Sequence, residues 1–173
     1  MVGSHQAPQA GLNPPDGVRA ARRSLRQAAG AVMMVRPAAF GWNPETAGSN
    51  AFQVEPADTD GHDRQQAVLE FDELARALGS AGVEVYALDE PGPNHCRDAV
   101  FPNNWVTLHH DGTVVLYPMQ APARRLERRT ELLTKLEEEG GYRVTRLLDL
   151  THHELSGRFL EGTGSVVFDH ASR

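Results

Sequence analysis

Cysteine, basic charge and long apolar runs are all scarce in this sequence. Its single cysteine, Cys96, cannot form an intramolecular disulfide, so the fold does not depend on an oxidising compartment. The 17 Lys and Arg are outnumbered by 23 Asp and Glu, for a net charge of -6. Nucleic acids and anionic membranes are usually bound by clustered Lys and Arg, so neither is expected as a partner. No apolar run approaches the ~20 residues of a membrane span. We therefore expect a soluble, cytoplasmic protein.

The composition predicts one globular α/β domain with an extension before it. Hydrophobic residues make up 40% and charged residues 23% of the 173 residues, and 16 Gly with 11 Pro indicate many turns. Residues 1–30 carry few large apolar side chains, so we predict a disordered or loosely ordered extension there. The arginines in residues 18–30 are also typical of an organellar transit peptide, although a frayed basic helix is the simpler interpretation. The domain itself is predicted at 31–173.

Periodicity predicts alternating strands and helices in that domain. Apolar residues at helical spacing, ended by glycines, indicate two helices, each followed by a strand. The pair Asp111-Gly112 between two β-rich runs indicates a hairpin. The aromatic and polar stretch 40–53 fits a substrate-covering loop. The expected strands are 31–35, 83–87, 98–101, 105–109, 113–117, 142–147 and 166–168, and the expected helices are 64–79 and 124–139.

The two helix–strand pairs indicate an internal repeat. Aligning Gly82 with Gly141 gives an offset of about 59 residues, within the range of propeller-type periods. The same alignment brings Asp98 near Glu161, each after its own strand. Repetition about an axis would direct both acids to one centre. The last residues, 164–173, read as a strand with no later element to cover it, so we expect this chain to be a fragment or a truncated gene product.

Two polar patches are candidates for chemistry. The first is Asn94–Trp105 and the second is Arg158–Ser165, where Glu161 lies among glycines and apolar residues. Turn-capping roles for Asp98 and Asn104, and a plain glycine-rich turn around Glu161, are the simpler alternatives.

Cysteine and histidine offer other chemistries. Cys96, beside His95 and Arg97, has the neighbours of a thiolate nucleophile, although a lone cysteine is more often structural. The doublets His109-His110 and His152-His153, with Asp111 or Glu154, suggest a metal site. Adjacent residues on a strand point to opposite faces, so a doublet supplies only one ligand, and we expect no metal.

Several segments together resemble a known family. They are MVRPAAFGWNPETAGSNAFQ, DAVFPNNWVTLHHDGTVVLYPM, RRLERR, GYRVTRLLDLTHHE and GRFLEGTGSVVFDHASR, spanning about residues 32–173. They are similar to the N-terminal half of the citrulline-utilisation hydrolases, in the amidinotransferase, arginine deiminase and dimethylarginine hydrolase (pentein) superfamily. The resemblance implies an incomplete α/β propeller of ββαβ-like units, about two to three of them present. It also implies no cofactor and no metal, with a nucleophilic cysteine and a histidine supplied by the C-terminal half.

The resemblance also assigns site residues. Asp98 and Phe101 match the pattern that holds the planar substrate group, and Glu161 matches the carboxylate that binds substrate N–H groups and orients the histidine. Asn104 stands where arginine-using relatives have an aspartate, and the aspartate of the glycine motif is replaced near Gly164. We thus expect Asp98 and Glu161 as catalytic residues and Phe101 and Asn104 as substrate-binding residues.

The implied reaction is hydrolysis of a ureido or guanidino C–N bond in a small-molecule substrate. Asn104 favours citrulline, with ornithine, ammonia and carbon dioxide as products. An arginine deiminase or dimethylarginine hydrolase is the alternative, and an inactive remnant that binds a ligand or partner is the alternative from another class. The chain alone is expected to be inactive. The sequence leaves the oligomeric state open, a homo-oligomer included.

Overall fold

The computed structural model describes residues 28–55, 61–89 and 96–169. Residues 29–168 form one compact unit. The predicted disorder of the N-terminal extension falls largely on residues outside this description. None of the helices in the described part of the chain combines the length and apolar character needed to cross a lipid bilayer.

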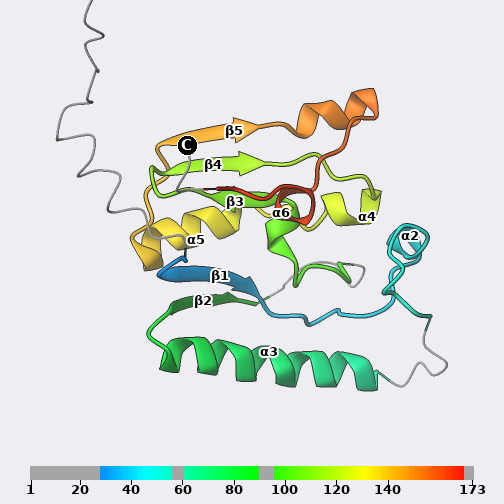
Figure 1. Cartoon of the computed structure of the whole chain (residues 1–173), viewed down its shortest axis with the longest axis horizontal. Helices are drawn as coiled ribbons and strands as arrows, with labels where there is room; N and C mark the ends of the chain where they lie inside the picture. The colour runs from blue at the N-terminus through cyan, green and yellow to red at the C-terminus, as the bar shows by residue number, and fades with distance from the viewer. Residues whose placement is uncertain (1–27, 56–60, 90–95, 170–173) are drawn as a thin grey trace, which may run out of the picture. The chain divides into compact units, whose positions relative to one another are not determined.

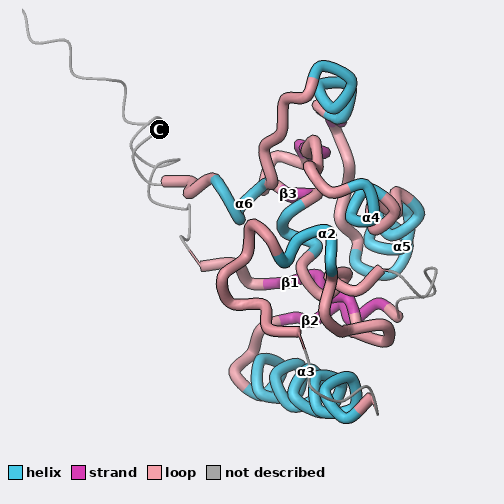
Figure 2. The backbone as a smooth tube through the Cα atoms, turned by 90° about the vertical axis from the view of Figure 1, so that its right-hand side faces the viewer, coloured by secondary structure: helices cyan, strands magenta, loops and turns pink. Residues whose placement is uncertain are grey.

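The first half of the unit is a strand–helix–strand arrangement. Strand β1 (Ala31–Val35) pairs in parallel with β2 (Glu84–Leu88), with Ala31 opposite Glu84 and Val35 opposite Leu88. The long helix α3 (His62–Ser80) joins them and packs against β2 (Figure 1). Gly82 makes the turn back to the sheet with a φ of 83°, a left-handed conformation that suits glycine. The tube in Figure 2 shows β1 and β2 side by side, with α3 below β2.

The second half contains a three-stranded sheet in the order β3-β4-β5. Strands β3 (Val106–Leu108) and β4 (Thr113–Leu116) form the predicted antiparallel hairpin, turning at Gly112 with a φ of 80°. Helix α5 (Glu131–Gly140) then leads to β5 (Arg146–Asp149), which pairs in parallel with β4.

The two halves repeat the same connection. Each has a parallel strand pair joined by a helix, and the glycine after each helix, Gly82 or Gly141, has a positive φ. This agrees with the repeat expected from the sequence. The described residues form two small sheets and no closed ring of units, so the α/β class holds while the predicted propeller count remains a prediction.

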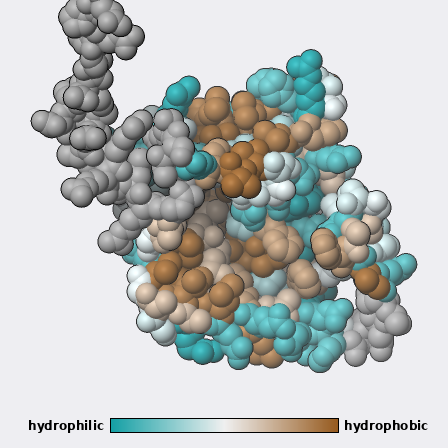
Figure 3. All heavy atoms as spheres, viewed as in Figure 1, coloured by the Kyte–Doolittle hydropathy of each residue, from teal (hydrophilic) through white to brown (hydrophobic). Residues whose placement is uncertain are grey.

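Both sheets contribute to one hydrophobic core. Its members are buried side chains from β1, β2, β3, β4, α5 and the turn before β3, with Trp105, Val114 and Met119 almost fully enclosed. They are Val35, Leu88, Cys96, Ala99, Trp105, Val106, Val114, Leu116, Met119, Leu132, Leu133 and Leu136. By contrast, every residue of the edge strand β5 is exposed, including Leu147 and Leu148. Apolar side chains accordingly gather over β5 on the surface, whereas polar ones cover α3 (Figure 3).

Two predicted strands are wrong. Residues 98–101 form consecutive turns, in which the backbone N–H of Phe101 donates to the carbonyl of Asp98 at 3.0 Å. Residues 166–168 form no strand pairing in the described part of the chain, although Val166 has an extended backbone. Strand-forming residue types predict an extended backbone, but they do not indicate whether a neighbouring strand is available to pair with it.

The predicted helix 124–139 is two helices rather than one. Helix α4 (Pro122–Arg125) ends at Arg125, with Leu126 as its C-cap, and α5 begins at Glu131. In the break between them, Arg128 forms an ion pair with Glu154, a tertiary contact that helical periodicity does not predict. The strand predicted at 142–147 begins later, at Arg146.

Candidate active site

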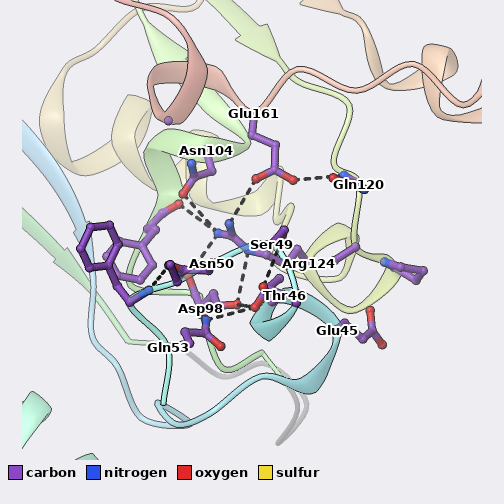
Figure 4. Close-up of a pocket in the computed structure, with 17 residues that line it drawn as sticks. Glu45, Thr46, Ser49, Asn50, Gln53, Asp98, Asn104, Gln120, Arg124 and Glu161 are labelled. Atoms are coloured by element: carbon purple, nitrogen blue, oxygen red, sulfur yellow. Dashed lines mark hydrogen bonds and ion pairs between the residues drawn. The ribbon is translucent and has the colours of Figure 1, made fainter. Parts of the chain in front are cut away.

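An open pocket of about 1090 Å³ brings together all four site residues predicted from the sequence. Asp98 and Phe101 come from the turns after β2, Asn104 ends the short helix η1 (Pro102–Asn104), and Glu161 directly precedes α6 (Gly162–Ser165). The loop 40–53, which carries the single turn α2 (Pro44–Ala47), lines the opposite side with residues between Glu45 and Gln53 (Figure 4). The residues that the repeat directed to one centre therefore share one pocket, as expected.

A guanidinium group lies between the two acids. Arg124 of α4 is buried, with Nε 3.8 Å from Asp98 Oδ2 and Nη1 3.7 Å from Glu161 Oε2. Its Nη2 also donates to Asn104 Oδ1 at 3.4 Å (Figure 4). Arg124 keeps two like charges in one pocket by lying between them. Sequence reasoning assigned no role to it, although it lies in the segment RRLERR.

A third carboxylate lies behind this arginine. Glu127 is buried, and its Oε2 accepts hydrogen bonds from both Nε and Nη2 of Arg124 at 3.1 Å. Burial raises the pKa of Glu127 from 4.5 to about 7, because the neighbouring Arg124 only partly offsets the lost hydration. Within the described residues, Glu127 Oε1 has no hydrogen-bond partner. Three acidic side chains thus surround one guanidinium, and Asp98 and Glu161 alone exceed its charge.

Glycines let the Glu161 segment approach the pocket. A Cβ on Gly162, where φ is 40°, would lie 2.2 Å from the carbonyl oxygen of Asn103. A Cβ on Gly164 would lie 2.2 Å from Nδ2 of Asn104. Only glycine permits this close packing of α6 on η1. The glycine-rich turn considered as an alternative is thus a short helix, and Glu161 before it accepts from the backbone N–H of Gln120 at 3.1 Å.

The loop 40–53 is fastened to the rest of the site by its polar side chains. Glu45 Oε2 accepts from the backbone N–H of Ala123 at 2.9 Å, at the start of α4. Asn43, Thr46 and Gln53 all donate to the Asp98 carboxylate. The loop therefore forms one wall of the pocket, while its predicted covering function remains a prediction.

The other candidate chemistries lie elsewhere. Cys96 is 2% exposed in the hydrophobic core and does not line the pocket. Glu154, the proposed third ligand beside His152-His153, pairs with Arg125 at 3.2 Å and with Arg128, and accepts from the backbone N–H of Met119. Within the described ranges, no group of three or more His, Cys, Asp or Glu side chains is placed to hold a metal ion.

The sequence match and the fold correspond to the pentein superfamily, the class indicated by the sequence. A family model described as "N,N dimethylarginine dimethylhydrolase, eukaryotic" matches residues 36–173, and the chain belongs to this family. The resemblance to the superfamily is thus confirmed. The matching model is named for dimethylarginine, the substrate class given above as the alternative to citrulline. No curated protein matches the sequence.

Two solved structures match the chain, and the first is similar in fold. One is the apo structure of ArgZ, an arginine dihydrolase from the ornithine-ammonia cycle in cyanobacteria, with a TM-score of 0.52 and 18% identity over 83% of this chain. The other is an adduct of dimethylarginine dimethylaminohydrolase with 4-chloro-2-hydroxymethylpyridine, with a TM-score of 0.44 and 17% identity over 69% of this chain. The chain spans only 19% and 40% of the lengths of these two proteins.

Proposed function

We propose that this chain supplies the substrate-binding carboxylates of a hydrolase that cleaves a C–N bond of a guanidino amino acid. The observation that carries the proposal is the pocket in which Asp98 and Glu161 lie on either side of Arg124, with Glu127 behind it. One cation faces the two pocket carboxylates Asp98 and Glu161, so the cluster can accept a second cation even when Glu127 is protonated. A guanidinium is a permanent cation that offers only N–H donors, which suits carboxylate acceptors.

Each residue has a defined part in this proposal. Asp98 and Glu161 accept hydrogen bonds from the guanidino nitrogens and stabilise positive charge that develops on them. The ring of Phe101, which is 46% exposed at the pocket, lies against the planar group. Arg124 holds the two acids in place through its contacts with both.

Residues 31–173 then form the N-terminal half of a larger catalytic domain, with a cysteine and a histidine in the other half. The thiolate adds to the guanidino carbon, the C–N bond to the departing amine breaks as the histidine delivers a proton, and water releases the ureido product. The enclosed position of Cys96 in the core supports a nucleophile from elsewhere. The apolar surface of β5, with Leu147 and Leu148 exposed, supports further units packing beside it.

Citrulline hydrolysis is the second candidate, and Asn104 is the observation that favours it. A ureido group is neutral and presents a carbonyl oxygen, to which an asparagine N–H can donate while an aspartate cannot. Asn104 lies in the pocket beside Arg124, as this candidate requires.

The test is turnover by the full-length protein with N,N-dimethylarginine, arginine and citrulline, following released amine or ammonia and the amino acid product. We expect turnover of a guanidino substrate, and loss of at least about 100-fold in kcat/KM for Asp98→Asn and Glu161→Gln, because each removes a charged acceptor. Glu131→Gln, at an exposed position at the start of α5, is the control and keeps wild-type turnover. Absence of turnover with all three substrates would refute the proposal, and turnover of citrulline alone would establish the second candidate.

A further inference from the structure

The Asp98 carboxylate is held by a loop about fifty residues earlier in the sequence. Asn43, itself only 3% exposed, donates through Nδ2 to Asp98 Oδ2 at 2.7 Å, and this hydrogen bond is buried. Thr46 Oγ1 donates to the same oxygen at 3.4 Å, and Gln53 Nε2 donates to Oδ1 at 3.4 Å (Figure 4). The shortest of these contacts is the one made by Asn43.

A second hydrogen bond, which caps helix α2, fixes the orientation of the Asn43 amide. Its Oδ1 accepts from the backbone N–H of Glu45 at 3.1 Å and so caps the first turn of α2. With the oxygen used by the cap, the NH₂ group is the end that meets Asp98. The backbone N–H of Asn43 also donates to Gln53 Oε1 at 3.3 Å, which closes a ring of hydrogen bonds through Asn43, Gln53 and Asp98.

The two oxygens of Asp98 are held unequally. Oδ2 accepts from Asn43 and Thr46 and lies 3.8 Å from Arg124 Nε. Among the residues that the structure describes, Oδ1 accepts only the long contact from Gln53. An ionised carboxylate has about four acceptor sites, so Oδ1 keeps capacity for another donor. The last torsion of an aspartate is broad and roughly two-fold, so the carboxylate does not set its own orientation and neighbouring donors must set it.

We propose that Asn43 is a positioning residue that turns the Asp98 carboxylate so that Oδ1 can accept from a guanidino N–H of the substrate. This inference rests on the proposed function, because it assigns Asp98 the substrate contact. Asn43 belongs to the loop 40–53 and acts on the substrate only indirectly, through Asp98.

Two substitutions separate this task from helix capping. Asn43→Asp has nearly the same shape and keeps an oxygen for the cap, but it replaces the donor by a second carboxylate facing Asp98. Asn43→Ser also keeps a capping oxygen but is too short to reach Asp98. If capping were the only task, both variants would resemble the wild type, because both aspartate and serine are good caps.

The matched control is Gln66→Glu. Gln66 Nε2 donates to Glu70 Oε1 at 2.8 Å on the exposed surface of α3, away from the pocket. The substitution makes the same exchange of amide for carboxylate, at the same kind of hydrogen bond, and adds the same charge to the chain. We expect it to leave binding and turnover unchanged.

The experiment measures the Kd of arginine by calorimetry, together with KM and kcat, on the full-length protein, the three variants above and Asp98→Asn. Losing a hydrogen bond to a charged group predicts a rise of roughly 10-fold or more in Kd and KM for both Asn43 variants. A variant that is merely less stable loses folded protein, which lowers apparent kcat while Kd and KM stay at the wild-type values.

The outcomes separate the two proposals. Wild-type Kd and KM in Asn43→Ser or Asn43→Asp, while Asp98→Asn binds poorly, would overturn the role of Asn43 and leave the proposed function standing. A protein that binds arginine but turns over none of N,N-dimethylarginine, arginine and citrulline would refute the proposed function alone, and the Kd values would still decide the role of Asn43. A protein that neither binds nor hydrolyses would overturn both.

Discussion

Replacing Glu127 with glutamine removes a buried carboxyl group whose ionisation opposes folding. Burial raises the pKa of Glu127 from 4.5 to about 7, with Arg124 acting in the opposite direction. Between these two pH values the folded state keeps a proton that the unfolded state has lost, so stability falls as the pH rises through this window. Below this pH window Glu127 is protonated in both the folded and the unfolded state. Above it Glu127 is ionised in both states, and its cost to the free energy of folding no longer changes with pH. Each tenfold change in proton affinity is about 1.4 kcal/mol, so the full cost is about 3 kcal/mol.

Glutamine cannot ionise, so the variant escapes this pH-dependent cost. We expect the free energy of unfolding of Glu127→Gln, relative to the wild type, to improve by about 2 to 3 kcal/mol between about pH 4.5 and about pH 8. Any constant cost of weakening the contact with Arg124 cancels in this comparison. Urea unfolding of both proteins at each pH gives the four values required.

Glu131→Gln is the matched control for the Glu127 experiment. Glu131 is exposed, and hydrogen bonds from its own backbone N–H and from Arg129 lower its pKa, so it titrates below the window. Its relative stability should therefore not change between the two pH values. If Glu127→Gln and Glu131→Gln behaved alike, or if the Glu127 difference stayed under about 1 kcal/mol, the account of a buried and poorly compensated carboxyl would be refuted.

Two further substitutions test the specificity and the packing of the site. Asn104→Asp should lower the ratio of kcat/KM for citrulline to kcat/KM for arginine in the full-length protein by roughly 5- to 150-fold, because two acceptors would then face each other at the ureido oxygen. An unchanged ratio would remove Asn104 from substrate recognition. Gly162→Ala should lower the free energy of unfolding by more than about 2 kcal/mol, since its Cβ would lie 2.2 Å from Asn103 O. The control is Gly157→Ala, where φ is 65° but a Cβ would meet nothing within 4 Å, so it should lower the free energy of unfolding only by the ~1 to 2 kcal/mol of a left-handed alanine. Equal losses for the two variants in thermal or urea unfolding would contradict the packing argument.

The regular elements were predictable where local pattern and tertiary context agree. The strand at Ala31–Val35 has the predicted bounds, and α3 extends the predicted helix by only a few residues. The hairpin at Gly112 follows from turn chemistry alone. The pattern failed at 98–101, where β-prone residues form turns that direct Asp98 into the pocket, and at the break between α4 and α5. These two failures lie beside the site, where the backbone positions functional side chains instead of following its local secondary-structure propensity.

The site was predictable in its acids and unpredictable in its cation. The internal repeat and the family resemblance both predicted that Asp98 and Glu161 lie at one centre, and the two acids do share a pocket. Arg124 belongs to an arginine-rich segment that reads as the exposed face of a helix, and no periodicity distinguishes it from Arg125 or Arg128. Arg124 is buried because Asp98 and Glu161, which are distant from it in the sequence, lie around it in the folded unit.

The separation of the two acids is a property of the core rather than of either motif. Asp98 follows β2 and Glu161 follows β5, so each acid is delivered by a different strand–helix–strand half. The halves meet through shared buried residues, among them Trp105, which is 1% exposed and directly follows Asn104. Close packing transmits small shifts, so a change in this core alters the distance between the carboxylates even when both motifs are intact. Arg124 bridges the same two halves within the pocket, and the geometry offered to a guanidino group therefore depends on the packing of the whole unit.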